Sequence, residues 1–408
     1  MRIRKKYLFY TLAIASSIAY SGEASIDSIV LYKIIENPWV YCLAFFLVGV
    51  LFTFFAIIFL SIPFKNKSIG SFIDPSFIRL RILKKEEVKY QVLAGIGNAV
   101  ATIGYFIIVS IFVDSSVVLA FSQFVILYLL MIESVAEKNT PTLAEIQSSV
   151  MVTSGAILGS ISLSGEIDIY ALMVVLLVIN PGWVLFATYN RKLKLLKIDE
   201  KLNDSINIRF WNLIFTTLFV FLGIFILKGN IIDETLHAIK SNFLLILSGS
   251  LITFFSVVLF VRAMGIGKAS ITQAVRATSI IFSLPMMYIA SLFYPGIIST
   301  GDEVMVLIKV MGIILVVLGV ISFALTEVKA YIFIKAKTGH PIRELLRNIW
   351  KIKGITNVSV VAGSYDIIAK ARIRTLGKGY ERIIRDLEKV KGIEKFEWQS
   401  ILKEWEEI

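Results

Sequence analysis

The chain has 408 residues, of which 57% are hydrophobic and 18% are charged, and its mean hydropathy is +0.79. Soluble domains are about 45–50% apolar and about 25% charged, so this composition excludes an ordinary soluble protein and predicts an integral membrane protein. The net charge is +12. In a membrane protein such a positive excess usually lies in the cytoplasmic loops, so it does not indicate nucleic-acid binding. With one cysteine, Cys42, no intramolecular disulfide can form, and with two histidines a conventional zinc site is not expected.

Ten apolar segments follow one another in residues 1–326. At a window of about 19 residues they lie near 7–26, 38–62, 90–112, 116–134, 146–163, 168–189, 207–227, 242–262, 269–293 and 304–325. We expect each to be a transmembrane helix, because about 20 apolar residues span the hydrocarbon core. The basic start and the first segment also fit a signal peptide, but the later segments need an anchored first helix.

Positive charge is unevenly distributed between the loops. Lysine and arginine gather in residues 1–6 and in the loops that follow segments 38–62 and 168–189. The loops at 113–115, 164–167 and 294–303 contain acidic residues but no lysine or arginine. The positive-inside rule therefore predicts a multi-pass protein of the cell membrane with a cytoplasmic N-terminus. Ten crossings return the C-terminus to the cytoplasm as well.

The membrane part repeats itself at an offset of about 154 residues. Two pairs of stretches align, FIIVSIFVDSSVVLAFSQ (106–123) with FVRAMGIGKASITQAVRA (260–277), and SGAILGS (154–160) with MGIILVV (311–317). In the first pair, Ser122 falls on Arg276. The halves are about 1–164 and 165–326, and an odd number of segments in each half requires the halves to be inverted in the membrane. Inverted repeats around a midplane site are a recurrent plan of transporters.

The composition changes at residue 327, and the rest of the chain is charged throughout. Hydrophobic periodicity predicts four strands and two helices, near 330–337, 341–352, 357–363, 366–373, 377–390 and 393–402. The order βαββαβ is that of the ferredoxin-like split βαβ fold. The predicted fold is therefore an all-α polytopic membrane domain in residues 1–326, with ten transmembrane helices in two inverted five-helix repeats, and an α+β ferredoxin-like domain in residues 327–408.

Two charged residues within the apolar segments are the main candidates for a substrate site. Arg276 lies inside the ninth segment, where an arginine costs on the order of 3 kcal/mol on insertion scales. Its five fixed donors suit the anionic group of a substrate. Glu23 in the first segment, with Asp27 one turn later, would bind a substrate amine or carry a proton. Together they would suit a zwitterion such as an amino acid. The alternatives are an ion pair or snorkelling for Arg276, and hydration at the membrane boundary for Glu23.

The remaining candidates are polar or aromatic residues within the apolar segments. They are Gln273, Trp183, Asn180, Ser122, Gln123 and Tyr105. Asn180 and Trp183 flank Pro181, which is expected to kink the sixth segment, and Trp183 would line the substrate path. Each of these residues has helix–helix packing as its alternative role.

Residues 7–325 resemble the drug/metabolite transporter superfamily, EamA type. The matching stretches are ESVAEKNTPTLAEIQSSVMVTSGAILG (133–159), PGWVLFATYNRKL (181–193) and VLFVRAMGIGKASITQAV (258–275). The chain departs from the family pattern at residues 137–141, where a Gly-Glu pair is common, and at residues 294–296, where the second half also lacks that pair. The resemblance implies ten helices in two inverted halves and a secondary transporter, with export more usual than import.

Residues 329–403 resemble the Lrp/AsnC-type ligand-binding (RAM) domain. The resemblance is carried by AYIFIKA, by GITNVSVVAGSYDIIAKARI (354–373) and by GIEKFE (392–397). It implies a domain that dimerises through its sheets and binds a small effector, often an amino acid. The effector-site residues it implies are Gly363, Ser364, Tyr365 and Asp366, with turn formation as their alternative role. A membrane domain stands where this family usually has a DNA-binding module, so no nucleic-acid partner is implied.

The leading hypothesis is a secondary transporter, an exporter of small organic metabolites such as amino acids, with a cytoplasmic domain that binds an effector and forms a homodimer. Its expected partners are the lipid bilayer, a small-molecule substrate and the effector. The alternative is a membrane-tethered sensor that does not transport, and a third class is a lipid flippase with a lateral opening. The sequence contains no GxxxxGK[ST] motif and no paired nucleophile and base, so neither an ATP-driven pump nor an enzyme is expected. No cofactor or metal is expected.

Overall fold

The computed structural model describes residues 5–65, 67–111, 122–136, 143–160, 173–198, 201–294, 303–325, 328–373 and 378–401. These residues fall into two compact units, Ile3–Leu129 with Met151–Val317, and Leu130–Val150 with Leu318–Ile408. The predicted loops 113–115 and 164–167, the join at 137–142 and the loop residues 295–302 lie outside the described residues.

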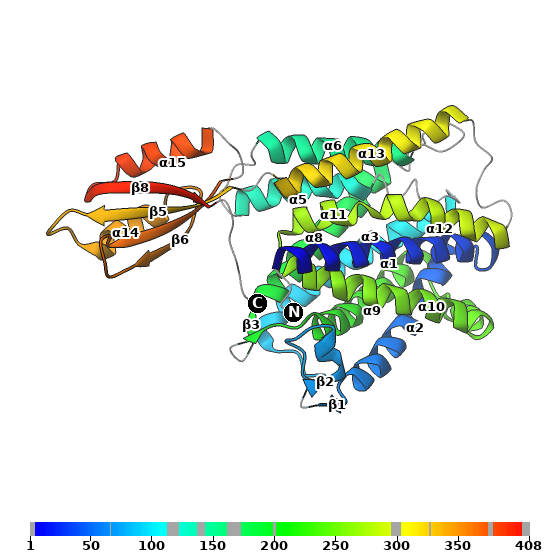
Figure 1. The fold of residues 1–408 in the computed structure, drawn as a ribbon. Coiled ribbons are helices and arrows are strands. Elements are labelled where there is room, and N and C mark those ends of the chain that lie inside the picture. The colour runs from blue at the N-terminus through cyan, green and yellow to red at the C-terminus, as the bar shows by residue number, and fades with distance from the viewer. Residues whose placement is uncertain are drawn as a thin grey trace. The chain divides into compact units, whose positions relative to one another are not determined.

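Helices make up most of the described residues before position 326 (Figure 1). They are α1 (Lys5–Lys33), α2 (Pro38–Leu60), α3 (Lys85–Ile111), α5 (Val125–Ala136), α6 (Leu143–Ser160), α8 (Asn180–Leu195), α9 (Ser205–Lys228), α10 (Ile232–Met264), α11 (Ala269–Arg276), α12 (Ser279–Phe293) and α13 (Glu303–Leu325). Short hairpins β1–β2 (Pro63–Phe64, Lys67–Ser68) and β3–β4 (Lys197–Ile198, Lys201–Leu202) lie in two of the loops. In each predicted apolar segment, nearly all of the described residues are helical.

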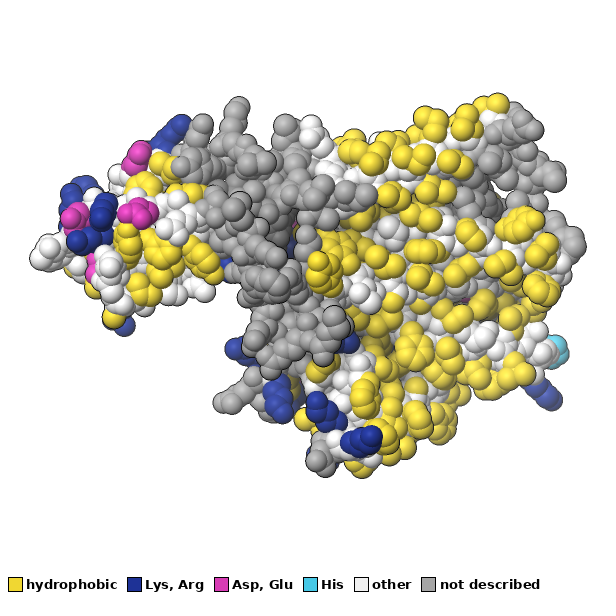
Figure 2. Space-filling model, in the orientation of Figure 1, with side chains coloured by type: hydrophobic (Ala, Val, Ile, Leu, Met, Phe, Trp, Pro, Cys, Tyr) yellow, Lys and Arg dark blue, Asp and Glu magenta, His cyan; other side chains and the backbone are white. Residues whose placement is uncertain are grey.

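Five stretches within the described ranges are long and apolar enough to cross a membrane. They are α2, α3, α9, α10 and Ala269–Phe293, which contains α11 and α12. Figure 2 shows hydrophobic side chains over these helices, and lysine and arginine side chains near the hairpins. The chain is therefore a multi-pass membrane protein.

Local sequence signals explain where several helices begin and end. The Asn37 side chain accepts a hydrogen bond from the backbone N–H of Trp39 at the start of α2, and Pro38 occupies the first turn. The Asp204 carboxylate caps α9 by accepting from the backbone N–H of Asn207 at 2.7 Å. Gly229 ends α9 with a φ of +78°, a conformation that favours glycine.

Two of the predicted helices are interrupted. The sixth segment contains a π-helical turn over Val175–Ile179 directly before α8, and Pro181, where a kink is expected, lies in the first turn of α8. The ninth segment, which the sequence predicts as one helix, breaks at residues 277–278 into α11 and α12. Hydroxyl groups of α1 satisfy carbonyls at this break, because Ser17 donates to the Arg276 carbonyl at 3.1 Å and Ser21 donates to the Ser279 carbonyl at 2.7 Å. The sequence has no glycine or proline at the break, so its position could not be predicted.

Small residues let pairs of helices approach closely. Helix α3 runs along α8, where a Cβ on Gly97 would lie 2.6 Å from the carbonyl oxygen of Gly182. Helix α6 meets α13 in the same way, since a Cβ on Gly155 would lie 2.6 Å from the carbonyl oxygen of Gly312. Helix α1 packs along α10, and α2 packs between α9 and α10. Such contacts between small residues are typical of helix association in membranes.

The C-terminal domain is a four-stranded antiparallel sheet with the order β6-β7-β5-β8. Its elements are β5 (Val328–Ala336), α14 (Ile342–Trp350), β6 (Ile355–Val360), β7 (Ile367–Ile373), α15 (Lys378–Glu388) and β8 (Ile393–Ile401). This is the predicted βαββαβ order. Alternate residues of β5, Ala330, Ile332 and Ile334, are fully buried and pack with Leu345 and Ile349 of α14. The opposite face of the sheet carries the intervening side chains of β5.

The close contact of α3 with α8 predicts a selective effect of adding one methyl group. Gly97→Ala should lower the free energy of unfolding by about 1–3 kcal/mol, because backbone atoms of α8 block the new Cβ. Gly223→Ala is the matched control, since its Cβ would meet only Ile103 Cδ1 at 3.5 Å. Thermal unfolding of both variants in detergent measures the difference. Equal stabilities of the two variants would contradict the packing described here.

Candidate functional site

A small polar cavity lies among the helices of the first unit. Its volume is about 30 Å³, which is room for one or two water molecules. It is lined by Tyr20, Glu23, Phe45, Phe46, Asn98, Thr102, Tyr105, Phe106, Trp183, Arg209, Thr253, Val257 and Arg276. These residues come from α1, α2, α3, α8, α9, α10 and α11, so the cavity joins segments from both predicted halves. In this conformation it is too small for an amino acid.

Arg276 is buried against three aromatic rings. Its guanidinium carbon lies 3.9 Å from the ring centroid of Tyr20, 4.6 Å from that of Phe260 and 5.7 Å from that of Trp183. One terminal nitrogen donates to the Ser256 hydroxyl at 3.1 Å. The side chain is 2% exposed, and Nε has no hydrogen-bond partner in the described part of the chain. Cation–π contacts therefore hold the charge, and they leave donor capacity free.

Glu23 provides the negative charge of the cavity. Its half-buried carboxylate interacts electrostatically with both Arg276 and Arg209. Within the described ranges, neither arginine comes within the 4 Å of a direct ion pair with it. Arg209, on α9, is 3% exposed, and its Nε also has no hydrogen-bond partner there. If all three groups are ionised, the lining has two positive charges and one negative charge.

Sequence reasoning missed Arg209. The residue lies in the motif NIRFWN, only four positions into α9, where an arginine looks like part of the basic loop before the helix. The available signal was its position within the apolar segment 207–227. Its burial brings it to the cavity together with the predicted residues Arg276 and Glu23.

Tyr105 connects the cavity to a second carboxylate behind it. Tyr105 is one of the lining residues, and its hydroxyl donates to Oδ2 of Asp27 at 3.3 Å. The Tyr41 hydroxyl donates to Oδ1 of the same carboxylate at 2.7 Å. Asp27 is fully buried, and sequence reasoning noted it only as a neighbour of Glu23 on one helix face. Tyr41 was not predicted, because a hydrogen bond between two helices leaves no periodic signal.

The structure separates the other predicted residues into two groups. Trp183 lines the cavity and makes an edge contact with Tyr20, with ring centroids 6.4 Å apart. Asn180, Gln273, Ser122 and Gln123 are buried but are not among the residues that line this cavity. The Gln123 amide donates to the Ser122 hydroxyl at 3.3 Å. These four residues are placed outside the cavity in this conformation.

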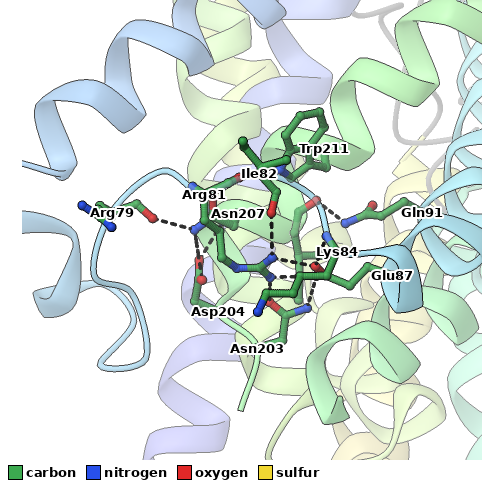
Figure 3. A network of polar contacts seen from close by, with 11 residues as sticks. Arg79, Arg81, Ile82, Lys84, Glu87, Gln91, Asn203, Asp204, Asn207 and Trp211 are labelled. Carbon is green, nitrogen blue, oxygen red and sulfur yellow. Dashed lines mark hydrogen bonds and ion pairs between the residues drawn. The ribbon is translucent and has the colours of Figure 1, made fainter. Parts of the chain in front are cut away.

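A network of polar contacts joins the two loops that contain the hairpins (Figure 3). Arg81 forms a bidentate ion pair with Glu87, with N–O distances of 2.6 and 2.7 Å, and also donates to the Asn203 side chain at 2.7 Å. The Asn203 amide donates to the same carboxylate at 2.6 Å. Asn207 accepts from the Arg81 backbone N–H at 3.1 Å and donates to the Arg79 carbonyl at 3.0 Å. Bidentate charged contacts of this kind fix geometry strongly.

A second ion pair reinforces the same end of the helices. The Lys194 ammonium donates to Oδ2 of Asp74 at 2.6 Å, and the backbone N–H and hydroxyl of Ser205 donate to the same oxygen at 2.8 and 2.6 Å. Burial by itself raises the pKa of the Asp74 carboxyl. The Lys194 charge and the Ser205 donors outweigh burial and lower that pKa from 3.8 to about 2. The sequence identified these loops only by their basic charge.

The predicted effector-site turn has an inner and an outer part. Oδ2 of Asp366 accepts from the Ala336 backbone N–H at 2.8 Å, so this carboxylate fastens the turn to β5. The Tyr365 ring lies 5.5 Å from the Phe333 ring, and a hydrogen bond to Glu397 raises the pKa of the Tyr365 hydroxyl. Gly363 and Ser364 are exposed. The turn therefore offers backbone and hydroxyl groups to a ligand, while Asp366 has a structural partner.

Comparison with known proteins identifies this second domain. Residues 329–407 match the family model described as the Lrp/AsnC ligand binding domain. This part of the chain is an Lrp/AsnC ligand-binding domain. The match leaves residues 1–328 outside, so it gives no family for the membrane helices.

Other comparisons add little. No curated protein matches the chain. A solved structure described as "Crystal structure of protein" is 12% identical and covers 76% of this chain and 98% of its own, with a TM-score of 0.47. A second, "Crystal structure of PH0061", is 16% identical and covers 32% of this chain and 77% of its own, with a TM-score of 0.19. Both scores are too low to support an argument about the fold.

The low pKa of Asp74 predicts an acid-dependent loss of stability. Because the folded-state pKa of about 2 lies below the ordinary 3.8, ionised Asp74 stabilises the folded state by roughly 2 kcal/mol. This contribution is fully present above about pH 4 and is lost as the pH falls toward 2. Thermal unfolding in detergent between pH 2 and pH 6 should show this loss, and Asp74→Asn should remove it. Asp204→Asn is the control, because burial raises the pKa of that carboxyl. An unchanged acid profile in Asp74→Asn would contradict the assignment.

Proposed function

We propose that the helical part is a secondary transporter, an exporter of small organic metabolites with amino acids as the favoured class, of the EamA type of the drug/metabolite transporter superfamily. The observation that carries the proposal is the cavity in which Arg276, Arg209 and Glu23 meet between helices of both halves. Charged groups inside a membrane domain are costly and are characteristic of substrate or ion pathways.

The helix packing supports two inverted halves of five helices. In such a repeat α1 corresponds to α8, α2 to α9, and α3 to α10. The contact of α3 with α8 therefore corresponds to the contact of α10 with α1, and both are present. The contact of α3 with α9 corresponds to the contact of α10 with α2, and both are present as well. Each contact is thus matched by its counterpart. Gly155 and Gly312, which the repeat aligns with one another, also lie in direct contact, as expected for residues on a two-fold axis.

The charges of the cavity favour a substrate with both a carboxylate and an amine. Two arginines provide donors for a carboxylate, and their Nε atoms have no protein partner within the described residues. Glu23 provides an acceptor for an ammonium group. Trp183 and Tyr20 add apolar surface beside these charges. An α-amino acid carries this combination of groups.

Transport requires the cavity to enlarge and to open on one side at a time. At about 30 Å³ the cavity is too small for the proposed substrate in this conformation. The polar network at Arg81 and the Lys194–Asp74 pair hold the helices together at the end that carries the basic loops. We place this end and both termini in the cytoplasm, following the positive-inside rule. Rocking of the two halves would then expose the cavity alternately.

The Lrp/AsnC domain would give the transporter a cytoplasmic sensor for a small effector and a means to dimerise. The sheet face opposite α14 and α15 carries Tyr331, Phe333 and Ile368 in the register that alternates with the buried residues. A second copy would cover this face. An effector bound there biases transport only if it binds the two conformations of the carrier with different affinities.

A second candidate function is a membrane-tethered sensor that does not transport. The observation that favours it is the small volume of the cavity in this conformation. The polar lining distinguishes the two candidates, because a sensor whose helices no longer transport has no need for two buried arginines beside a glutamate.

Transport by purified protein in proteoliposomes tests the proposal. We expect the wild type to transport at least one member of a panel of labelled amino acids. Arg276→Ala or Arg209→Ala should reduce the apparent affinity for that amino acid roughly 10–100-fold, because charged hydrogen bonds to it are lost. Lys67→Ala, an exposed loop position, is the control and should transport normally. If the wild type moves no member of the panel while the full chain still binds an amino acid, the sensor replaces the transporter.

A charge on the open sheet face should prevent dimerisation. Phe333→Asp places an unpaired carboxylate where the second copy would pack, so the full chain in detergent should shift from dimer to monomer in analytical ultracentrifugation. Lys351→Glu lies on an exposed position beside α14 and should leave the dimer intact. A dimer that survives Phe333→Asp would show that the sheets are not the interface.

A further inference from the structure

Next to the cavity, behind the lining residue Tyr105, lies a carboxyl group that the proposed substrate contacts do not use. Asp27 lies on α1 one turn after Glu23 and is fully buried. Both of its oxygens accept hydrogen bonds from phenols, from Tyr41 at 2.7 Å and from Tyr105 at 3.3 Å. Because these two hydrogen-bond partners come from different helices, the fold holds the carboxyl group in a defined position.

Asp27 has no cationic partner in the described part of the chain. The titratable groups that face it are Tyr20 and Glu23 on its own helix, Tyr41 and Cys42 on α2, and Tyr105 on α3. None of these is a base that carries positive charge, and Glu23 adds a like charge. Asp74 shows the contrast, because that ionised carboxylate is buried with Lys194 at 2.6 Å. A carboxylate without such a partner in an apolar membrane domain is strongly favoured in its neutral form.

We propose that Asp27 is a proton-binding site, reached from the cavity through Tyr105, and that it couples proton movement to transport. The coupling rests on the proposed function, whereas the proton site itself does not. Tyr105 is the link, since its side chain lines the cavity and its hydroxyl contacts the carboxylate. Tyr41 contacts the other oxygen but is not among the residues that line the cavity.

The proton transfer is balanced and needs no further reactant. A hydronium ion in the cavity gives its proton to the Tyr105 oxygen as the Tyr105 hydroxyl proton passes to Oδ2 of Asp27. The products are water, a neutral tyrosine and a neutral carboxylic acid. The reverse transfer returns the proton to cavity water. One proton moves in each direction and no electrons are transferred.

The arrangement of the charged groups, from Asp27 to Glu23 to the two arginines, determines whether substrate and proton move together or are exchanged. Asp27 interacts with Glu23, and Glu23 interacts with both arginines. A substrate ammonium at Glu23 is therefore the charge nearest to Asp27, and it stabilises the ionised carboxylate. The amine and the proton consequently compete. This competition gives exchange of substrate against protons, which suits export driven by an inward proton gradient.

Infrared spectroscopy of the full-length protein in lipid, without substrate, tests the proton site. At neutral pH the wild type should show the carbonyl band of a protonated, hydrogen-bonded carboxylic acid. Asp27→Asn keeps nearly the same shape and should lose that band, while Glu23→Gln should retain it. A wild type without the band, or a band that persists in Asp27→Asn, would overturn the proposal.

The route is tested by transferring the protein to D2O and following the shift of the same band. Tyr105→Phe should slow the exchange at least tenfold, and Tyr41→Phe, which also removes one donor, should leave its rate close to that of the wild type. Equal effects of the two variants would reject Tyr105 as the link.

Coupling is tested in proteoliposomes with the amino acid that the labelled panel identifies. A pH gradient should accelerate its movement in the wild type and have no effect in Asp27→Asn. Acceleration that survives in Asp27→Asn rejects the coupling. If no amino acid moves at all, the proposed function and the coupling fail together, whereas the infrared result still decides the proton site.

Discussion

The structure of the membrane domain depends on how it holds charged groups away from water. Arg276 is 2% exposed and Arg209 is 3% exposed, and Asp27 is completely buried. Each ionisable group in such a place has a desolvation cost, which is largest when the group is charged and which must be offset by contacts that the fold provides. For Arg276 these contacts are aromatic faces, with the Tyr20 ring at 3.9 Å. For Asp27 they are two phenols. The close helix crossings, including the one at Gly97, bring these groups together.

The end of the domain that carries the basic loops holds its charges differently from the centre. Near the basic loops, Arg81 pairs with Glu87 and Lys194 pairs with Asp74, each at 2.6 Å. The two members of each pair satisfy one another's charge and hydrogen-bonding groups, so little capacity remains to bind a ligand. In the cavity, by contrast, Glu23 and its two arginines are not in direct contact within the described residues. Paired charges fix structure, and unpaired charges are available to a ligand or a proton, so the difference separates the scaffold from the site.

The sequence predicted the parts of the fold that local patterns specify. The described residues of the ten apolar segments fall almost entirely on helices, and alternation in residues such as Ala330, Ile332 and Ile334 predicted the C-terminal sheet. It also predicted four cavity residues, Arg276, Glu23, Tyr105 and Trp183. It missed Arg209, whose position near a basic loop concealed its burial, and the bond between Asp27 and Tyr41. Contacts between distant helices depend on how the helices cross, and no spacing in the sequence encodes that. For the same reason Asn180, Gln273, Ser122 and Gln123 were chosen by polarity but do not line the cavity.

Alternating access requires the cavity to open in turn to the two sides of the membrane. Site-directed thiol labelling measures this opening, after Cys42→Ser removes the single cysteine and Thr253→Cys introduces one thiol into the lining. A membrane-impermeant thiol reagent is then added from either side of oriented proteoliposomes, and the rate of modification is measured. We expect modification from both sides, and we expect a bound amino acid to slow it. A thiol that reacts from neither side, or from one side only under all conditions, would contradict alternating access.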